Sequence, residues 1–198
     1  GDVAEVTIQG SNIRGKYHTG ERFKTFAPED PDLVKLLRDK GVKITLMTNS
    51  LGSTDEPIVH AGYTLYREPM LELGIDLYEI SSSRVKRNRR MNLFGASLGR
   101  LHAKTAVIDR KTLFVGSMNL DPRSATINTE LGAVIESPEL ARELLRVIDI
   151  DRLQSAYRVR LSASGNGCEW LSMEADDSVV VLTEEPDSST WQRFKLWM

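Results

Sequence analysis

Helical and strand-like stretches alternate between residues 31 and 80, and this alternation is the strongest constraint on the fold. Each of two helical stretches ends at a glycine, Gly41 or Gly74, and an apolar run of strand type follows directly, at 42–47 and at 75–80. Glycine is common just past the end of a helix because it adopts a left-handed backbone at little cost. The alternation predicts an α/β fold with a mixed β-sheet flanked by helices.

The second half of the chain has a different order of predicted elements. Residues 81–100 are polar, basic and contain glycine, so we expect a loop there. A tight turn at 109–111 should join two strands, and Pro138 should open a helix. The predicted strands are 103–108, 112–115, 129–136, 157–161, 169–173 and 179–182, and an amphipathic stretch with Trp191, Phe194 and Trp197 ends the chain.

Length and composition favour one domain. The chain has 198 residues, which is enough for a single hydrophobic core. Residues 1–24 hold few apolar side chains and four glycines, so we expect a loosely ordered N-terminal segment before one catalytic domain at 25–198. Residues 156–198 are the small β-rich C-terminal extension of that domain. Because the chain begins at Gly1 without a methionine, we expect a processed or truncated product.

Charge and cysteine content exclude several classes of protein. The single cysteine, Cys168, excludes an intramolecular disulfide and a cysteine-based zinc site. The net charge of −2 gives no signal for an anionic partner, so we do not expect nucleic acid to be one. A basic run at 84–90 is either a solvated loop or a contact for headgroups at a membrane surface. No apolar run is long enough to span a bilayer.

Residues 101–119 carry most of the chemical information. Side chains two apart on a strand point to the same face, so His102 and Lys104 should project together. Ser117 and Asn119 repeat this spacing at the end of the paired strand. The four polar groups are therefore expected to converge on one patch.

This set of side chains suits a phosphate diester, which is anionic and gains charge on its oxygens in the transition state. Lys104 supplies a point charge with hydrogen-bond donors. Ser117 and Asn119 supply neutral donors on a rigid element. Gly116 would let the backbone approach the phosphate closely. No metal or organic cofactor is implied, because these groups take over the role of a metal's charge.

His102 is the candidate nucleophile or acid/base group. Attack by a neutral imidazole on phosphorus gives a covalent intermediate that divides one difficult step into two. A carboxylate behind the other ring nitrogen would fix the tautomer. Glu130, on the third predicted strand of this region, is the candidate for that role, although it could also be an ordinary edge-strand charge.

The same stretch resembles the HKD motif of the phospholipase D superfamily, His-x-Lys-x(4)-Asp followed by Gly-x-x-Asn. Glu130 also falls where that family places the glutamate that orients the histidine. The wider sequence, over roughly residues 25–198, is similar to the C-terminal half of bacterial cardiolipin synthases. The residues that match the motif are His102, Lys104, Asp109, Gly116, Ser117 and Asn119.

The resemblance implies a phosphatidyl transfer on a phospholipid substrate, in which one HKD histidine attacks and a second protonates the leaving group. It also implies a membrane-associated enzyme at the bacterial inner membrane. Neither His18 nor His60 has a lysine two residues on, so this chain holds one HKD motif. The second HKD half would be a missing N-terminal half or a homodimer partner, as in single-motif nucleases of the superfamily.

Three interpretations of function remain open at this point. The leading one is a cardiolipin synthase-like phosphatidyltransferase, and the second is a homodimeric phosphodiesterase or nuclease that uses the same residues. The third is a catalytically silent module that binds phosphate. Asp109 matches the motif, but its position at a predicted turn favours a role in stabilising that turn. We expect His60, on a predicted helix, to be structural.

Overall fold

The computed structural model describes residues 5–10, 35, 37–54, 57–87, 102–117, 129–165, 167–174, 176 and 178–188. Within these residues nine strands form one sheet in the order β6-β5-β4-β1-β2-β3-β7-β8-β9. The strands are β1 (Glu5–Gly10), β2 (Lys43–Asn49), β3 (Asp76–Ile80), β4 (Lys104–Ile108), β5 (Thr112–Gly116), β6 (Gly132–Glu136), β7 (Ala156–Leu161), β8 (Cys168–Met173) and β9 (Val179–Leu182). The helices are α2 (Pro57–Glu72), α3 (Ser82–Arg87) and α5 (Pro138–Gln154).

The sheet is mixed, as the alternation of helices and strands predicts. Strands β1, β2 and β3 are parallel to one another, and every other neighbouring pair among the described strands is antiparallel. The C-terminal extension continues the same sheet, because β7 pairs with β3 and carries β8 and β9 beyond it. The prediction of an α/β fold with a mixed sheet and flanking helices is confirmed.

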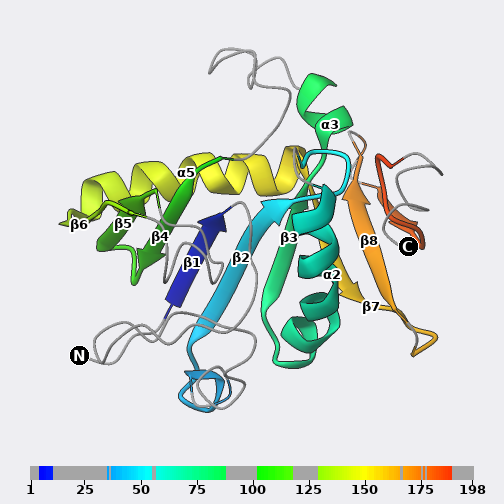
Figure 1. Ribbon diagram of the computed structural model, residues 1–198, viewed down its shortest axis with the longest axis horizontal. Coiled ribbons are helices and arrows are strands. Elements are labelled where there is room, and N and C mark those ends of the chain that lie inside the picture. Colours follow the sequence, from blue (N-terminus) through cyan, green and yellow to red (C-terminus); the bar gives the residue numbers. More distant parts are fainter. Residues whose placement is uncertain are drawn as a thin grey trace.

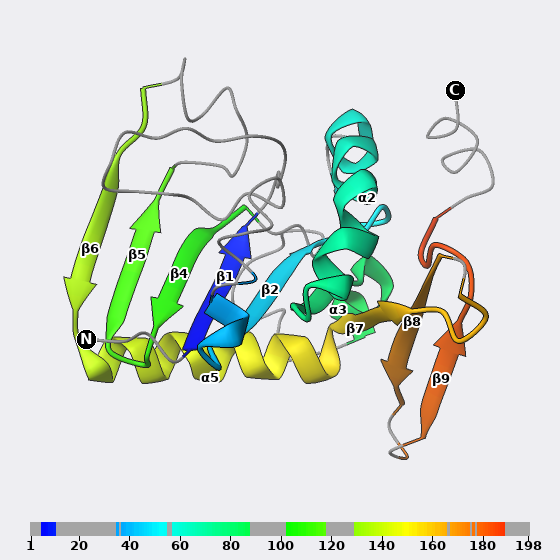
Figure 2. The same cartoon turned by 90° about the horizontal axis from the view of Figure 1, so that it is seen from below.

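Helices cover both faces of the sheet (Figures 1 and 2). On β2, Ile44 and Leu46 point to the face that packs against α2, where Tyr63 and Met70 complete the core. Met47 points to the opposite face, against Ile148 of α5. This alternation is the two-residue period of a strand that is buried on both sides. Figure 2 shows α5 crossing the strands from β6 towards β7.

The N-terminal segment corrects one prediction. We expected residues 1–24 to be loosely ordered, but Glu5–Gly10 form β1 between β2 and β4, in the interior of the sheet. The strand signal at this position is short, because only Val6 and Ile8 alternate with polar residues before Gly10. Hydrogen bonds to β2 and β4 stabilise β1, and its own short sequence does not predict this pairing.

The expected loop at 81–100 also begins differently. Ser82–Arg87 form the short helix α3, which Ser81 caps by accepting a hydrogen bond from the backbone N–H of Arg84 at 3.1 Å. A serine cap followed by one buried apolar residue, Val85, is a weak helix signal within a basic run. Residues 88–100 lie outside the described part of the chain.

Turns and helix ends agree with the sequence. Asp109 and Arg110 both have positive φ, at 51° and 56°, as the two central residues of a type I′ hairpin require. Gly41 and Gly74 have φ of 76° and 77°, the left-handed conformation expected where helices end. Trp191, Phe194 and Trp197 lie outside the described residues. Among the described helices, none combines the length and apolar character needed to cross a bilayer.

Candidate active site

The predicted site lies at one edge of the sheet, meaning the edge formed by the ends of its strands and not an outermost strand. Strand β4 begins at Lys104, and β5 ends at Gly116. Gly10, the last residue of β1, pairs with Lys104, so this is also the edge where the parallel strands β1, β2 and β3 end. In open α/β sheets, ligands bind outside the carboxyl ends of the parallel strands.

His102 and Lys104 are in contact, as the strand spacing predicts. The ammonium Nζ of Lys104 lies 3.2 Å from Nδ1 and 3.3 Å from Nε2 of His102, and it donates to the carbonyl oxygen of His102 at 2.9 Å. Lys104 is buried with 8% of its surface exposed, whereas His102 is exposed. A cation is thus held beside an imidazole that solvent and a substrate can reach.

Ser117 and Glu130 form a second pair at this edge. The Ser117 hydroxyl donates to Oε2 of Glu130 at 2.5 Å and accepts from the backbone N–H of Leu131 at 3.0 Å. The backbone N–H of Ser117 donates to the carbonyl of Leu131 at 2.9 Å. Glu130 is therefore held by Ser117, and its orientation of His102 stays a prediction.

Gly116 has a structural reason to be glycine. A Cβ placed there would lie 2.8 Å from Cζ of Phe114 and 2.9 Å from the carbonyl oxygen of Leu131. Both distances are too short for a real side chain, so glycine allows β5 and β6 to pair under the Phe114 ring. Its predicted approach to a phosphate stays a prediction. Asn119 lies outside the described residues, so its place at the site also stays a prediction.

Asp109 is not brought to this edge. It lies in the turn after β4, while His102 precedes the start of the same strand, so about 20 Å of extended chain separates the two residues. Its positive φ agrees with the interpretation that Asp109 stabilises the hairpin turn. A part for Asp109 in catalysis, which its match to the HKD motif implies, stays a prediction.

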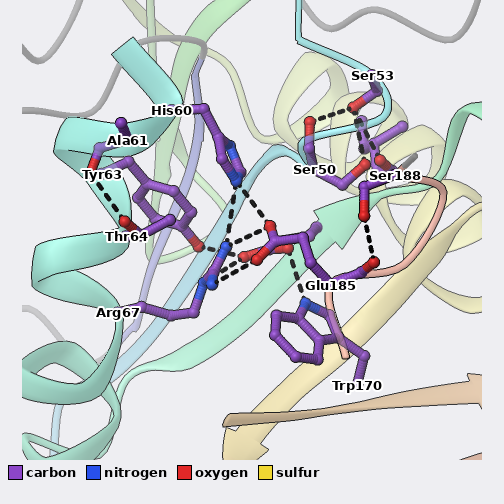
Figure 3. Close-up of polar contacts among 12 residues, drawn as sticks. Ser50, Ser53, His60, Ala61, Tyr63, Thr64, Arg67, Trp170, Glu185 and Ser188 are labelled. Atoms are coloured by element: carbon purple, nitrogen blue, oxygen red, sulfur yellow. Dashed lines mark hydrogen bonds and ion pairs between the residues drawn. The ribbon is translucent and has the colours of Figure 1, made fainter. Parts of the chain in front are cut away.

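A buried polar network joins α2 to β3, β8 and the C-terminal segment (Figure 3), and the sequence did not predict it. The carboxylate of Glu79 is fully buried and accepts from Tyr63 Oη and Trp170 Nε1, each at 2.8 Å. Arg67 Nε lies 2.8 Å from Glu79 Oε1. The Arg67 guanidinium also lies between the Tyr63 and Trp170 rings, 5.1 and 5.0 Å from their centroids. Such stacking favours a cation.

Glu185 joins this network from the C-terminal segment. His60 Nε2 lies 2.7 Å from Glu185 Oε1, and Arg67 donates to both Glu185 oxygens at 2.9 and 3.1 Å. Burial would raise the pKa of Glu185, but the hydrogen bond from His60 and the charge of Arg67 outweigh it and lower that pKa to about 2. The buried, bonded ring agrees with a structural role for His60.

The pKa values of the other members follow from the same contacts. Burial, reinforced by the charge of Glu79, raises the pKa of Tyr63 well above its ordinary value. Burial disfavours the charged form of Arg67, but the charges of Glu79 and Glu185 outweigh this and raise its pKa. The spacing of His60, Tyr63 and Arg67 on one helix face was the available signal.

The basic run is partly accounted for by contacts within the protein. Arg84 donates to Glu174 Oε1 at 3.0 Å, and also to the Ser172 hydroxyl and to the carbonyl of Met173. These contacts tie α3 to β8, so Arg84 is neither a simply solvated side chain nor one held out towards headgroups. The side chains of the rest of the run, at 86–90, lie outside the description. Among described residues, no cluster of His, Cys, Asp and Glu is placed to hold a metal ion.

A family match and similar protein sequences both relate the chain to cardiolipin synthases. Residues 24–152 match the family described as "Cardiolipin synthase, PLD-like domain". The chain is 40% identical over 172 residues to cardiolipin synthase C of Escherichia coli, which covers 85% of this chain and 36% of that protein. An uncharacterized protein of Helicobacter pylori is 32% identical over 161 residues, 80% of this chain and 30% of its own length. The chain thus spans about a third of these relatives.

Solved structures share the fold at low sequence identity. Nuc from Salmonella typhimurium, a phospholipase D family member, matches with a TM-score of 0.54 at 19% identity, over 79% of this chain and 82% of that one. Phosphatidylserine synthase from Haemophilus influenzae matches with a TM-score of 0.52 at 13% identity, over 78% of this chain and 34% of that one. At these identities the likeness supports the fold alone.

Proposed function

Because the chain belongs to the PLD-like domain family of cardiolipin synthases, we propose that it is one half of a phosphatidyltransferase that acts on phospholipid phosphodiesters through a phosphohistidine. The single observation that carries the proposal is the contact between an exposed imidazole, His102, and a buried ammonium, Lys104, at the carboxyl edge of the sheet. Relatedness to cardiolipin synthase C supports a lipid as the substrate.

The proposed reaction assigns one task to each group. A neutral nitrogen of His102 attacks phosphorus, the new P–N bond forms, and the P–O bond to the leaving alcohol breaks. An acceptor hydroxyl, such as the glycerol headgroup of a second lipid, then gives its proton to the second histidine and attacks phosphorus, so that a new P–O bond forms and the P–N bond to His102 breaks. Lys104 neutralises charge on the phosphate oxygens. Ser117 is placed near the same edge by Glu130 and Leu131, and Asn119 is the further predicted donor.

A second HKD half is part of the proposal, because the leaving alcohol needs a proton from another histidine. It is either an N-terminal half or a second copy of this chain. The curated relatives are about three times as long as the matched segment, which supports a missing half. We also propose that the assembled enzyme works in contact with the inner membrane, where its lipid substrate is found.

A homodimeric phosphodiesterase or nuclease is the second candidate. One observation favours it, namely that this chain matches 82% of the length of Nuc, so a chain of this size accounts for most of that protein. The net charge of −2 weakens the case for nucleic acid, since phosphate backbones are bound through excess cationic side chains.

Separate assays with lipid and with DNA distinguish the two candidates. The protein, alone and mixed with a supplied N-terminal half of a cardiolipin synthase, is incubated with vesicles of labelled phosphatidylglycerol and, separately, with plasmid DNA. We expect lipid product and intact DNA. His102→Ala should lower product formation at least about 10³-fold, because the nucleophile is lost. Arg142→Gln, an exposed side chain on α5, is the control and should keep the activity. DNA cleavage without lipid product would reverse the order of the candidates.

A further inference from the structure

The C-terminal segment at residues 185–188, named here the strap, crosses from β9 back to the body of the domain. Two carboxylates of the strap hold it in place. Glu185 binds His60 of α2, and Asp187 binds Ser83 at the start of α3 (Figure 3 shows the Glu185 contacts). The strap has one apolar side chain, that of Pro186, and it is buried. The strap is therefore fastened mainly by polar contacts.

The Glu185 anchor is a charged, largely buried arrangement. Its side chain is 12% exposed and that of His60 is 2% exposed. His60 Nε2 lies 2.7 Å from Glu185 Oε1 and 3.3 Å from Nη2 of Arg67. Loss of the carboxylate would leave His60 and part of the Arg67 guanidinium without their partner, which is costly in a dry environment.

The Asp187 anchor holds the strap to the residues that follow β3. Its carboxylate accepts from the Ser83 hydroxyl at 2.7 Å, the Ser81 hydroxyl at 2.5 Å and Tyr157 Oη at 3.3 Å. Its own φ is 55°, so the chain turns sharply at this residue. The strap thereby ties together the end of β3, the start of α3 and β7.

The strap also contacts the loop that follows β2. A Cβ on Gly52 would lie 2.5 Å from Cβ of Asp187 and 2.6 Å from its carbonyl oxygen. Gly52 therefore permits a backbone approach that no other residue would allow. Within the same loop, Ser53 donates to the carbonyl of Ile80 at 2.8 Å, so this loop is hydrogen-bonded to the last residue of β3.

These two loops stand at the same edge of the sheet as His102 and Lys104. Strand β2 is separated from β4 by β1 alone, so the loop at 50–54 starts about 10 Å from the β4 end. In the proposed function a substrate bound at His102 lies at this same end of the strands, so the loops at 50–54 and 81–83 belong to the surface that we expect it to meet.

We propose that Glu185 and Asp187 are positioning residues: the strap locks the loops after β2 and β3, and this lock sets how a lipid headgroup is received beside His102. The effect on substrate rests on the proposed function, whereas the lock itself does not. Glu185 and Asp187 touch no reacting atom in this scheme. They act through residues 50–54 and 81–83.

Hydrogen exchange followed by mass spectrometry tests the lock without any activity. In Glu185→Gln and Asp187→Ala, amides in 50–54 and 81–85 should exchange at least about tenfold faster, because local opening no longer breaks charged hydrogen bonds. Amides of β4 and β5 should keep their rates. Glu184→Gln, an exposed carboxylate one residue away, is the matched control. Equal rates in the two loops, or a uniform increase throughout the chain, would overturn the lock.

Gly52→Ala provides an independent variant in case the carboxylate variants fail to fold. It leaves both carboxylates in place and pushes the strap away from the loop side, so the same local pattern of exchange is expected. Kinetics with phosphatidylglycerol vesicles then test positioning: KM should rise about fivefold or more in Glu185→Gln, while kcat changes less than about twofold. Equal losses of kcat in all variants would indicate destabilisation alone and contradict positioning. Wild-type protein inactive on lipid counts against the proposed function, and exchange still decides the lock.

Discussion

Glu79 is a charge that this fold keeps in its interior, since its carboxylate has no exposed surface. Three groups replace water around it: the Arg67 guanidinium, the Tyr63 hydroxyl and the Trp170 ring N–H. A buried ion pair does not necessarily add stability over an apolar substitute, but removing one partner leaves the other charge uncompensated. Residue 79 should therefore be far less tolerant of change than its neighbours on β3.

Glu79→Gln should lower the free energy of unfolding by about 3–5 kcal/mol, as expected when a buried pair is broken. Asp76→Asn on the same strand is the matched control. Its pair with Arg158 is solvent-exposed, so its loss should cost less than about 1 kcal/mol. Urea denaturation of both variants measures the difference. Equal costs would contradict the view that the Arg67–Glu79 contact holds α2 to the sheet.

Residue-scale prediction from the sequence succeeds where partners are close along the chain. His102 and Lys104 are two residues apart, so their contact could be predicted from spacing, although His102 precedes the first residue of β4. His60 and Glu185 are 125 positions apart, and no local pattern indicates that they meet. Asp109 lies in the hairpin turn that its local sequence predicts, with a positive φ.

At the scale of elements, β1 and the strap bind the domain from opposite ends of the chain. Strand β1 completes the interior of the sheet between β2 and β4. The strap holds the extension β7–β9 to α2 and α3. Neither element has a strong local signal, since β1 has two alternating apolar residues and the strap is polar. Helices α2 and α5 are long and amphipathic, so their periodicity could be predicted.

The strap should make stability depend on pH. The pKa of Glu185, about 2, lies below its ordinary value of 4.5, so the carboxylate stabilises the folded state above pH 4.5. That contribution disappears as the pH falls from 4.5 towards 2. At pH 7 the free energy of unfolding of the wild type should exceed that of Glu185→Gln by roughly 3 kcal/mol, because one pKa unit corresponds to about 1.4 kcal/mol.

Urea titrations of the two proteins from pH 7 to pH 2.5 measure this difference. The difference in free energy of unfolding between the two proteins should decrease below pH 4.5. Protonation of the other carboxylates affects both proteins equally and cancels in this difference. A gap that stays constant over the whole range would mean that the charge of Glu185 is not what fastens the strap.

At the scale of the whole molecule, the class of fold could be predicted but the strand order could not. Alternating helices and strands indicate a mixed α/β sheet, and the structure has one. The order depends on pairs distant in sequence, such as β1 with β4 and β3 with β7. The result places one His-x-Lys pair at one edge of one sheet, and in the proposed enzyme a second such edge has to face it.

The central claim is that His102 becomes covalently bound to phosphorus. Protein with its second half is mixed with phosphatidylglycerol, quenched in alkali, digested and examined by mass spectrometry for a phosphorus-bearing group on the peptide that contains residue 102. We predict an adduct on His102 in wild type, none in His102→Asn, and its decay when glycerol is added as acceptor. Turnover of lipid with no adduct at residue 102, or with the adduct on another residue, would contradict the account.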